Sequence, residues 1–498
     1  MREIELKFAV DPSFDLPGIN GRAGVMEIQE LPPLTLRSVY YDTVDLRLAR
    51  NGVTLRYRTG ENGPLWTLKL PTGDRRAAIR DEIDFSSPAE KLPEQALDLV
   101  VGFARTASLR EVATLETKRD RWKLLGAGDV GLAVVYRDEV ALLEDERVLT
   151  RFREIELESL SVDLKQLTAI GEALRGAGAI PSEPVPKAVR ALGPRATAPP
   201  DVPAVPELGP EKPSAQVVKA FLVGSVDRLI AHHAAARLGN EEGVHQMRVA
   251  VRRLRSHLRT FAPLVEPTWS TEIVPDLKWL ADLLGEVRDL DVLTERFEAT
   301  AGDLHPEIDP LFDALRSAQE KARTALYGAL RGERYRALLE KLVCSSQNPP
   351  VTPEATRPPD EVLIPQVAST WKRLRKAVGA GGKRPDSHAL HEIRIRAKRA
   401  RYAAEAVAGS LGDVGPKAKR FAAAAARVQD VLGEHQDAVV AQEKIRAIVG
   451  KHPHEGSFAV AAGRLIERQT RSAAEARKAW PRAWKELDRR KRRSWLKV

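Results

Sequence analysis

Apolar and polar residues alternate with a period of two through most of the first 160 residues, a pattern typical of half-buried strands. The expected strands are residues 3–8, 36–41, 53–58, 65–70, 78–85, 115–124, 130–140 and 151–160. A helix is expected over residues 94–103, where Pro93 suits the first turn. Short turns such as residues 60–63 link successive strands, which predicts an antiparallel sheet.

Carboxylates gather on the polar sides of the first and last of these strands. Glu3, Glu5 and Lys7 face one way in the first strand, and Glu154 and Glu156 repeat the acidic alternation near residue 155. Carboxylates spaced about 7 Å apart along a strand suit a divalent cation and the anion that it carries. The alternative is an ordinary strand with its charged side in water.

The intervening strands carry basic pairs and mixed charges on one side. Arg56 and Arg58 share a side, as do Arg119 and Arg121. Seven or eight such strands in succession predict a closed barrel with a polar lumen, because closure removes the sheet edges and gives the charges a wet interior. A solvated sheet face is the simpler alternative for any one strand.

A proline-rich segment follows the strands. Residues 194–213 contain seven prolines, which disfavour helix and sheet and favour an extended, semi-rigid spacer. We therefore expect two domains, at residues 1–193 and 214–490, joined by a linker at 194–213.

Beyond the linker the apolar period becomes helical and the sequence repeats itself. The segment 245–255 returns at 391–401, and residues 284–289 return at 432–437. Two elements in the same order at nearly the same offset predict a duplicated unit, with one copy at about 214–344 and the other at about 362–490. The duplication fails at Glu405, which stands where the first copy has Arg259.

Each copy carries a basic stripe on one helix face, beside an apolar stripe that packs. The basic positions and their adjacent arginines are His245, Arg248, Arg252, Arg253, Arg255 and Arg259 in the first copy, and His391, Arg394, Lys398, Arg399 and Arg401 in the second. Rows of cations about 5 to 6 Å apart are unfavourable unless an anion bridges them, although a solvated face is the alternative. Asp289 and Asp437 could pair with some of these arginines.

Composition narrows the class of protein. The 498 residues are 43% hydrophobic and 30% charged, which is typical of globular chains with two to four domains, and no apolar run is long enough to cross a bilayer. Residues 1–200 hold 28 Lys and Arg against 31 Asp and Glu, whereas residues 201–498 hold 51 against 38. The second half should therefore attract polyanions.

The single cysteine, Cys344, excludes an intramolecular disulfide, and we expect a cytoplasmic location.

The first half resembles the CYTH superfamily, the triphosphate tunnel metalloenzymes. The resemblance rests on the Glu-x-Glu-x-Lys motif at residues 3–7 and extends through residues 40–43, 55–58, 66–69, 117–122 and 154–158. Pro186 and Lys187 resemble the late Ser-Lys element of that family, with proline replacing serine. The resemblance implies a closed antiparallel β tunnel that acts on triphosphates with a divalent metal.

The resemblance also implies roles for particular residues. Glu3, Glu5, Glu154, Glu156 and Asp138 would hold one or two Mg²⁺ or Mn²⁺ ions, Glu5, Lys7 and Glu156 would be catalytic, and Glu82 would be a further wall residue. The triphosphate would contact Lys7, Arg37, Arg56, Arg58, Lys69, Arg80, Arg119, Arg121 and Lys187.

The second half resembles the CHAD domain, an all-α domain of two helical bundles that binds inorganic polyphosphate. His245 and His391 stand at the histidine positions that name the domain, although helix-interface histidines are the alternative. The expected architecture is thus an α+β multidomain protein, with an N-terminal β-barrel tunnel carrying a few helices and a C-terminal domain of two repeated bundles. Association with polyphosphate granules is a further expectation.

The leading functional hypothesis is an inorganic triphosphatase joined to a polyphosphate-binding domain. One alternative on the same fold is a cyclase producing cyclic AMP, or a triphosphatase for thiamine or nucleoside triphosphates. Another is a polyphosphate-binding scaffold with weak or absent catalysis. Nucleic acid is disfavoured as a partner because the basic helices lack interleaved aromatic residues that could stack on bases.

Overall fold

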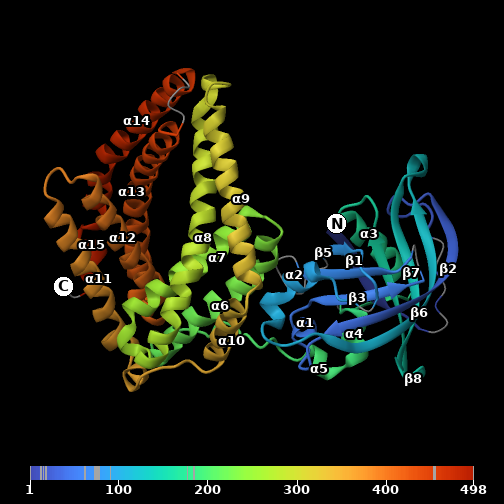
Figure 1. The fold of residues 1–498 in the computed structure, drawn as a ribbon. Helices are drawn as coiled ribbons and strands as arrows, with labels where there is room; N and C mark the ends of the chain where they lie inside the picture. Colours follow the sequence, from blue (N-terminus) through green and yellow to red (C-terminus); the bar gives the residue numbers. More distant parts are fainter. Residues whose placement is uncertain are drawn as a thin grey trace. The chain divides into compact units, whose positions relative to one another are not determined.

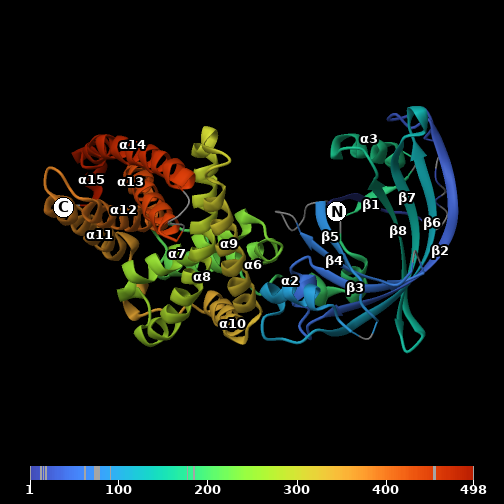
Figure 2. The ribbon, with the colours of Figure 1, turned by 45° about the horizontal axis from the view of Figure 1, so that its top comes forward.

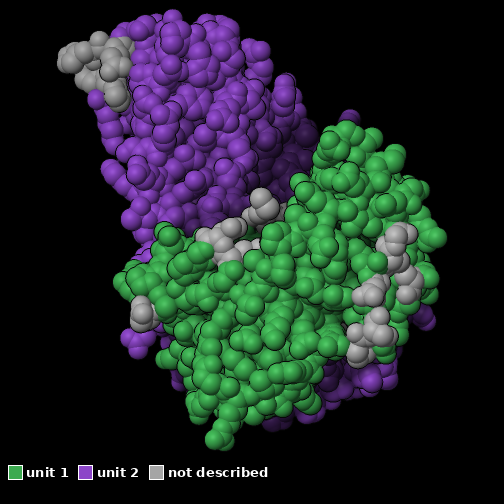
Figure 3. All heavy atoms as spheres, turned by 90° about the vertical axis from the view of Figure 1, so that its right-hand side faces the viewer, with its two compact units in different colours: residues 1–201 green, residues 202–498 purple. Residues whose placement is uncertain are grey.

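The chain divides into two compact units, Met1–Asp201 and Val202–Val498, drawn green and purple in Figure 3. The computed structural model describes residues 2–11, 14, 16, 19–60, 63–71, 79–89, 91–176, 178–182, 185–451 and 456–496, without the side chains of Arg2, Glu3 and Ile79. The division falls inside the proline-rich segment 194–213. Within the described ranges, no helix combines the length and the apolar character needed to span a membrane.

The first unit is built on a nine-stranded antiparallel sheet, as the alternating pattern predicts (Figure 1). The strands are β1 (Arg2–Ala9), β2 (Glu27–Asp42), β3 (Thr54–Thr59), β4 (Leu65–Pro71), β5 (Ile79–Phe85), β6 (Arg110–Leu125), β7 (Gly131–Glu144), β8 (Arg147–Ser159) and β9 (Ile180–Ser182). Their order is β5-β4-β3-β2-β6-β7-β8-β1-β9. The short strand β9 was not expected from the sequence.

Strand β1 pairs with β5 as well as with its neighbours β8 and β9. Its second half pairs with β8 over Glu5–Phe8, and its first half pairs with β5 over Arg2–Ile4. Figure 2 shows the long strands β2 and β6 curving strongly, so that β5, β4 and β3 lie across from β7 and β8. The polar sides of these strands therefore face a common interior.

The apolar sides of the strands pack outward against helices. Phe8 and Leu157 belong to a buried cluster with Ile170 of α3 (Leu164–Arg175). The other helices of this unit are α1 (Arg47–Arg50), α2 (Glu94–Ala104), α4 (Lys187–Leu192) and α5 (Pro194–Thr197). The expectation that proline excludes helix from 194–213 is wrong for α5, because Pro194 occupies the first turn, where the missing N–H is not needed.

The second unit consists of helices throughout, with short 3-10 turns. Its helices are α6 (Ala215–Arg237), α7 (Glu241–Thr260), α8 (Pro267–Ala301), α9 (Asp309–Arg331), α10 (Glu333–Gln347), α11 (Pro359–Gly381), α12 (Ser387–Val407), α13 (Gly415–Val449), α14 (Gly456–Leu487) and α15 (Arg490–Arg493). Helix lengths recur in order, because α6, α7 and α8 have 23, 20 and 35 residues, and α11, α12 and α13 have 23, 21 and 35. Helices α7 and α12 are both capped by a polar side chain, from Asn240 and Asp386.

The buried carboxylate of Asp42 at the end of β2 holds the turn into α1. It accepts hydrogen bonds from the backbone N–H groups of Thr43, Leu48 and Ala49 at 2.6, 2.9 and 2.8 Å. We expect Asp42→Ala to destabilise the first unit by roughly 2 to 4 kcal/mol, because each orphaned buried donor costs about 1 to 3 kcal/mol. Hydrogen exchange of the buried β2 amides measures this loss. Exposed Glu30 in the same strand is the control: if Glu30→Ala is equally destabilising, the capping role is wrong.

Candidate active site

A cavity of about 200 Å³ lies inside the curved sheet. Every strand from β1 to β8 contributes a side chain to its lining, because side chains on alternate positions of each strand point to the same face. The lining residues are Glu5, Lys7, Tyr40, Thr54, Arg56, Arg58, Lys69, Arg80, Glu82, Arg119, Tyr136, Glu156, Glu158, Pro186 and Lys187. The interior is therefore polar and highly charged.

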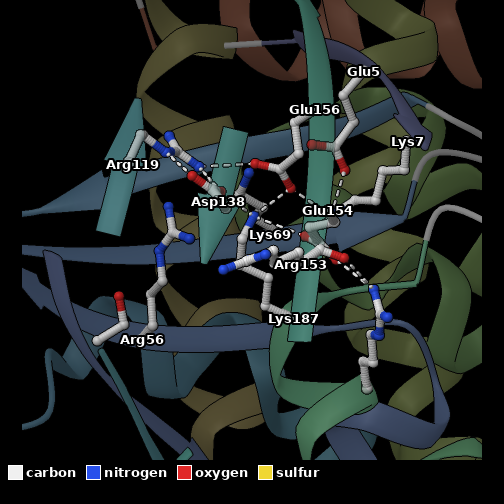
Figure 4. Close-up of polar contacts among 12 residues, drawn as sticks. Glu5, Lys7, Arg56, Lys69, Arg119, Asp138, Arg153, Glu154, Glu156 and Lys187 are labelled. Atoms are coloured by element: carbon white, nitrogen blue, oxygen red, sulfur yellow. Dashed lines mark hydrogen bonds and ion pairs between the residues drawn. The ribbon is translucent and has the colours of Figure 1, made fainter. Parts of the chain in front are cut away.

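Three buried carboxylates meet at one side of this cavity. Asp138 of β7 pairs with Glu154 of β8 across the strands, and Glu156 lies two residues further along β8. Oxygen atoms of all three lie within 4.8 Å of one another, and Asp138 and Glu154 are only 0% and 2% exposed (Figure 4). Carboxylates this close repel strongly unless cations lie between them.

Four cations contact the acidic cluster of Asp138, Glu154 and Glu156, and one of them, Arg190, lies 3.3 Å from Glu154. The Lys187 ammonium lies 3.0 Å from Asp138, 3.0 Å from Glu154 and 2.6 Å from Glu156. Lys7 lies 2.5 Å from Glu156 and 3.3 Å from Glu154. Arg119 contacts Asp138 at 2.6 Å and Glu156 at 2.9 Å. Sheet register produces these contacts, because Lys7 stands opposite Glu156 and Arg119 stands opposite Asp138.

The ion pairs keep these groups charged despite their burial. Burial alone would raise the pKa of Glu156, but Lys187, Lys7 and Arg119 hold that pKa well below its ordinary value. Burial alone would lower the pKa of Lys7, but Glu156, Glu5 and Glu154 raise it instead. Glu156 and Lys7 therefore both remain charged at neutral pH.

The acidic cluster has the donor set of a hard divalent cation. Carboxylate oxygens are the ligands that Mg²⁺ and Mn²⁺ prefer, and Glu5 lies close by, 3.9 Å from the Lys7 ammonium. The same oxygens are engaged by Lys7, Lys187 and Arg119, so a metal ion there would take the place of part of these contacts. The residues present fit such an ion.

The opposite wall of the cavity is mainly basic. Lys69 and Arg56 lie 3.3 and 3.7 Å from Glu82, which stands opposite Lys69 in the β4–β5 register. Burial, together with the charge of Arg56, lowers the pKa of Arg58 to about 10. Seven Lys and Arg line the cavity against four Glu. This surplus of positive charge suits a small polyanion.

Two residues predicted to bind triphosphate are not in the lining. Arg37 lies on the other face of β2 from Ser38 and Tyr40 and forms an exposed ion pair with Glu146 at 2.5 Å. Arg121 donates to the Pro32 carbonyl at 3.0 and 2.9 Å. The side chain of Glu3 lies outside the described part of the structure, so its predicted metal role is untested.

Five lining residues were not predicted as site residues. They are Tyr40, Thr54, Tyr136, Glu158 and Pro186. The alternation of side chains along a strand predicts two of these residues, because Thr54 shares a side with Arg56, and Glu158 shares a side with Glu156. Burial alone would raise the pKa of the Tyr40 hydroxyl, but Arg56, Arg58 and Lys187 lower it. Tyr40 thus lies in a strongly cationic environment.

The predicted basic stripe of the helical unit lies on α7 and α12, which contact each other. Its members make the following contacts: Arg248 with Asp289 at 2.8 Å, Arg252 with the Tyr402 hydroxyl at 2.9 Å, Arg253 and Arg401 with Glu405 at 3.2 and 2.7 Å, and His391 with Gln436 at 2.9 Å. Arg255, Arg259, Lys398 and Arg399 line a cavity of about 410 Å³. His245 and Arg394 complete the stripe, and the expected pairing of Asp289 with a stripe arginine is present.

Lys398 shows how crowded these cations are. Its burial, together with the charges of Arg252, Arg394 and Arg248, lowers its pKa to about 7. Burial and nearby arginines also lower the pKa of His245. A phosphate anion would relieve this repulsion.

The chain belongs to the family of proteins that join a CYTH domain to a CHAD domain. The CYTH domain model matches residues 1–180 and the CHAD domain model matches residues 220–446. An uncharacterized protein of Mycobacterium tuberculosis, Rv2226, is 33% identical over 99% of this chain and 97% of its own length. The predicted resemblance is therefore confirmed over nearly the whole chain.

Solved structures resemble parts of the chain. PptA from Streptomyces chartreusis is 22% identical with a TM-score of 0.46, covering 55% of this chain and 100% of its own. The CHAD domain from the plant Ricinus communis is 24% identical with a TM-score of 0.44, covering 59% of this chain and 95% of its own.

Glu156 supplies the central negative charge of the site. We expect Glu156→Gln to destabilise the first unit by roughly 3 to 5 kcal/mol, the usual cost of breaking a buried ion pair from one side, because Lys7, Lys187 and Arg119 each lose a partner. Hydrogen exchange of the β8 amides measures the change. The exposed Glu144→Gln variant is the control, and equal protection in both variants would show that the cluster contributes nothing to stability.

Proposed function

We propose that the first unit is a metal-dependent triphosphatase that hydrolyses inorganic tripolyphosphate, and that the second unit binds inorganic polyphosphate. The observation that carries the first part is a cavity lined by seven cationic side chains, with a buried cluster of three carboxylates at one side of it. In this proposal the curved sheet acts as a closed tunnel, held by the β1–β5 pairing.

The chemistry of phosphoryl transfer suits this lining. Transfer of a phosphoryl group requires charge neutralisation and alignment more than covalent catalysis. Arg56, Arg58, Lys69 and Arg80 would bind the non-reacting phosphates and fix their direction. Lys7, Arg119 and Lys187 stand between that wall and the acidic cluster, where they would neutralise charge on the phosphate being cleaved.

Mg²⁺ or Mn²⁺ held by Glu5, Asp138, Glu154 and Glu156, and by Glu3 if its side chain reaches, would supply further neutralisation of the phosphate oxygens. Glu5 and Glu156 line the cavity, so either carboxylate could accept a proton from an attacking water. Both roles need these side chains to be ionised, which agrees with the lowered pKa of Glu156.

The lining favours an inorganic substrate over a nucleotide. Among the described residues its two aromatic rings belong to Tyr40 and Tyr136, and the Arg119 guanidinium lies 4.0 Å from the centre of the Tyr136 ring. That ring face is therefore covered and does not offer a surface on which a base could stack. The lining otherwise consists of charged side chains, Thr54 and Pro186.

The proposal for the second unit rests on its basic stripe and on the duplication. We infer two repeated bundles from the recurring helix lengths and from the basic segments of α7 and α12. Crowded cations such as Lys398, with its pKa lowered to about 7, favour an anionic ligand. Polyphosphate matches this surface because its charges repeat along a flexible chain.

One observation favours a second candidate, a polyphosphate-binding scaffold without catalysis. Lys7, Lys187 and Arg119 already satisfy the carboxylates that would hold the metal ion. A site that never releases these contacts would bind phosphate without cleaving it.

Glu5 distinguishes these two candidates. We expect Glu5→Gln to reduce phosphate release from tripolyphosphate by about a hundredfold or more, because one lost ligand or base commonly costs 3 kcal/mol or so. The assay compares tripolyphosphate, pyrophosphate, ATP and thiamine triphosphate with Mg²⁺ or Mn²⁺. Glu144→Gln, on the exposed end of β7, should keep full activity. Absence of turnover by the wild-type chain on all four substrates would contradict the triphosphatase and leave the scaffold.

The basic stripe yields a separate prediction for polymer binding. We expect the double variant Arg248→Glu, Arg394→Glu to weaken long-chain polyphosphate binding at least about tenfold at physiological salt, and to make the salt dependence shallower, because fewer counterions are exchanged. Fluorescence anisotropy of labelled polyphosphate measures both quantities. The charge-matched control reverses Arg316 and Arg334, which lie on α9 and α10, and equal weakening there would show that net charge alone determines binding.

A further inference from the structure

Helices α7 and α12 align along their lengths, and two of the positions at which they differ change the bulk and the charge where the helices meet. With the offset of 146 residues between the copies, Arg253 corresponds to Arg399 and Arg255 corresponds to Arg401. Ser256 of α7 corresponds to Tyr402 of α12, and Arg259 corresponds to Glu405. The contact between α7 and α12 therefore contains two corresponding places, one at Ser256 and Arg259 and the other at Tyr402 and Glu405, and their side chains differ.

At the place formed by Tyr402 and Glu405, the arginines are neutralised. Glu405 lies 3.2 Å from Arg253 on α7 and 2.7 Å from Arg401 on its own helix. The Tyr402 ring fills the adjacent space, with the Arg253 guanidinium 5.2 Å from the ring centre. This side holds two guanidinium groups and one carboxylate, and the Tyr402 ring, which also lines the cavity described below, occupies the position that Ser256 has in the other copy.

At the place formed by Ser256 and Arg259, the positive charge is not balanced. Arg259 stands where Glu405 would be and, together with burial, it lowers the pKa of Arg399. Within the described ranges, no carboxylate forms an ion pair with Arg255, Arg259 or Arg399. This side therefore carries three guanidinium groups without an ion-pair partner among the described residues; the carboxylate nearest in charge effect, Glu392, pairs with Arg396 instead. The replacement of glutamate by Arg259 changes the local charge by two units.

The smaller side chain at the same place leaves a cavity. Ser256, where the other copy has Tyr402, lines the cavity of about 410 Å³ between α7, α8 and α12. The buried Ser256 hydroxyl oxygen has no hydrogen-bond partner among the described residues. The cavity thus combines a polar group lacking a partner with three uncompensated arginines.

The remaining walls strengthen the attraction for an anion. Arg252 and Lys398 add two further positive side chains, and Leu258, Val274 and Ile395 give the cavity an apolar side. Apolar walls lower the local dielectric constant, which increases the electrostatic attraction between guanidinium groups and a bound anion. Arginine also binds phosphate through paired N–H donors.

We propose that this cavity is an oligophosphate subsite, formed by Arg255, Ser256, Arg259 and Arg399, and that it exists in one of the two copies only. The inference rests on the proposed polyphosphate binding by the helical unit. It adds that the polymer is held asymmetrically, because the corresponding place at Tyr402 and Glu405 is filled and neutralised.

Calorimetric titration of tripolyphosphate into the full chain, without divalent metal ions and at physiological salt, tests the subsite. Arg259→Glu would reproduce the pairing seen at Glu405 and neutralise Arg255 and Arg399. We expect it to remove one tripolyphosphate equivalent per chain, or to weaken that equivalent at least about tenfold. The cavity inside the β sheet provides an internal reference, since its binding should be unchanged in this variant.

Two controls separate the possible causes of this result. Arg316→Glu, on exposed α9, changes the net charge equally and should bind tripolyphosphate as the wild type does. Glu405→Gln should also retain the tripolyphosphate equivalent that Arg259→Glu removes, because Glu405 does not line the Ser256 cavity. If Arg259→Glu and Arg316→Glu bind alike, the subsite is refuted.

Long-chain polyphosphate measured in parallel distinguishes failure of the subsite from failure of the proposed function. A wild-type chain that binds the polymer while Arg259→Glu retains every tripolyphosphate equivalent would refute the subsite alone. A wild-type chain that binds no polymer would refute the polyphosphate function and, with it, the subsite.

Discussion

The ion pairs among Asp138, Glu154, Glu156 and their cationic partners constrain the rest of the first unit. Charges buried to this extent are tolerated only where each carboxylate meets a cation at contact distance. Those contacts require β1, β6, β7 and β8 to lie in one register, with Lys7 opposite Glu156 and Arg119 opposite Asp138. The apolar residues at the alternate positions fix that register from outside, because a shift by one residue would bury the wrong face.

In the helical unit, carboxylates balance only part of the positive charge. Asp289 and Glu405 balance some of the basic stripe, whereas Arg255, Arg259 and Arg399 have no carboxylate partner in the described ranges. In the β unit, cations and carboxylates are matched within the fold, and the excess positive charge faces a cavity. In both units a surplus of positive side chains marks where an external anion would contribute to stability.

The period-two pattern was sufficient to predict most of the strands and most of the lining. It placed Glu5 and Lys7 on one side of β1 and Arg56 and Arg58 on one side of β3, and the structure has both pairs in the lining. Arg37 was assigned to the lining through the family resemblance, and alternation could not test that assignment, because both faces of β2 carry apolar residues there. In the structure Leu36, Ser38 and Tyr40 are buried, and Arg37 is not.

Contacts between distant strands were not available from the sequence. Lys187 reaches the acidic cluster from the start of α4, and nothing in its local pattern distinguishes it from a surface lysine; only the family resemblance suggested it. Likewise, the sequence showed that Glu405 stands where the first copy has Arg259. The effect of this difference on the local charge depends on how α7 and α12 pack against each other. Pairing of residues more than a hundred positions apart is set by the packed fold and not by local periodicity.

The matched charges also connect anion binding with metal binding. Lys7, Lys187 and Arg119 cannot contact a phosphate fully while they remain bound to Asp138, Glu154 and Glu156. A phosphate that draws these cations away exposes carboxylate oxygens, which are the ligands that a divalent ion requires. The two ligands should therefore bind cooperatively, since each removes the partners that compete with the other, and thermodynamic linkage makes the effect reciprocal. A chain with neither ligand keeps its buried charges paired and its stability intact.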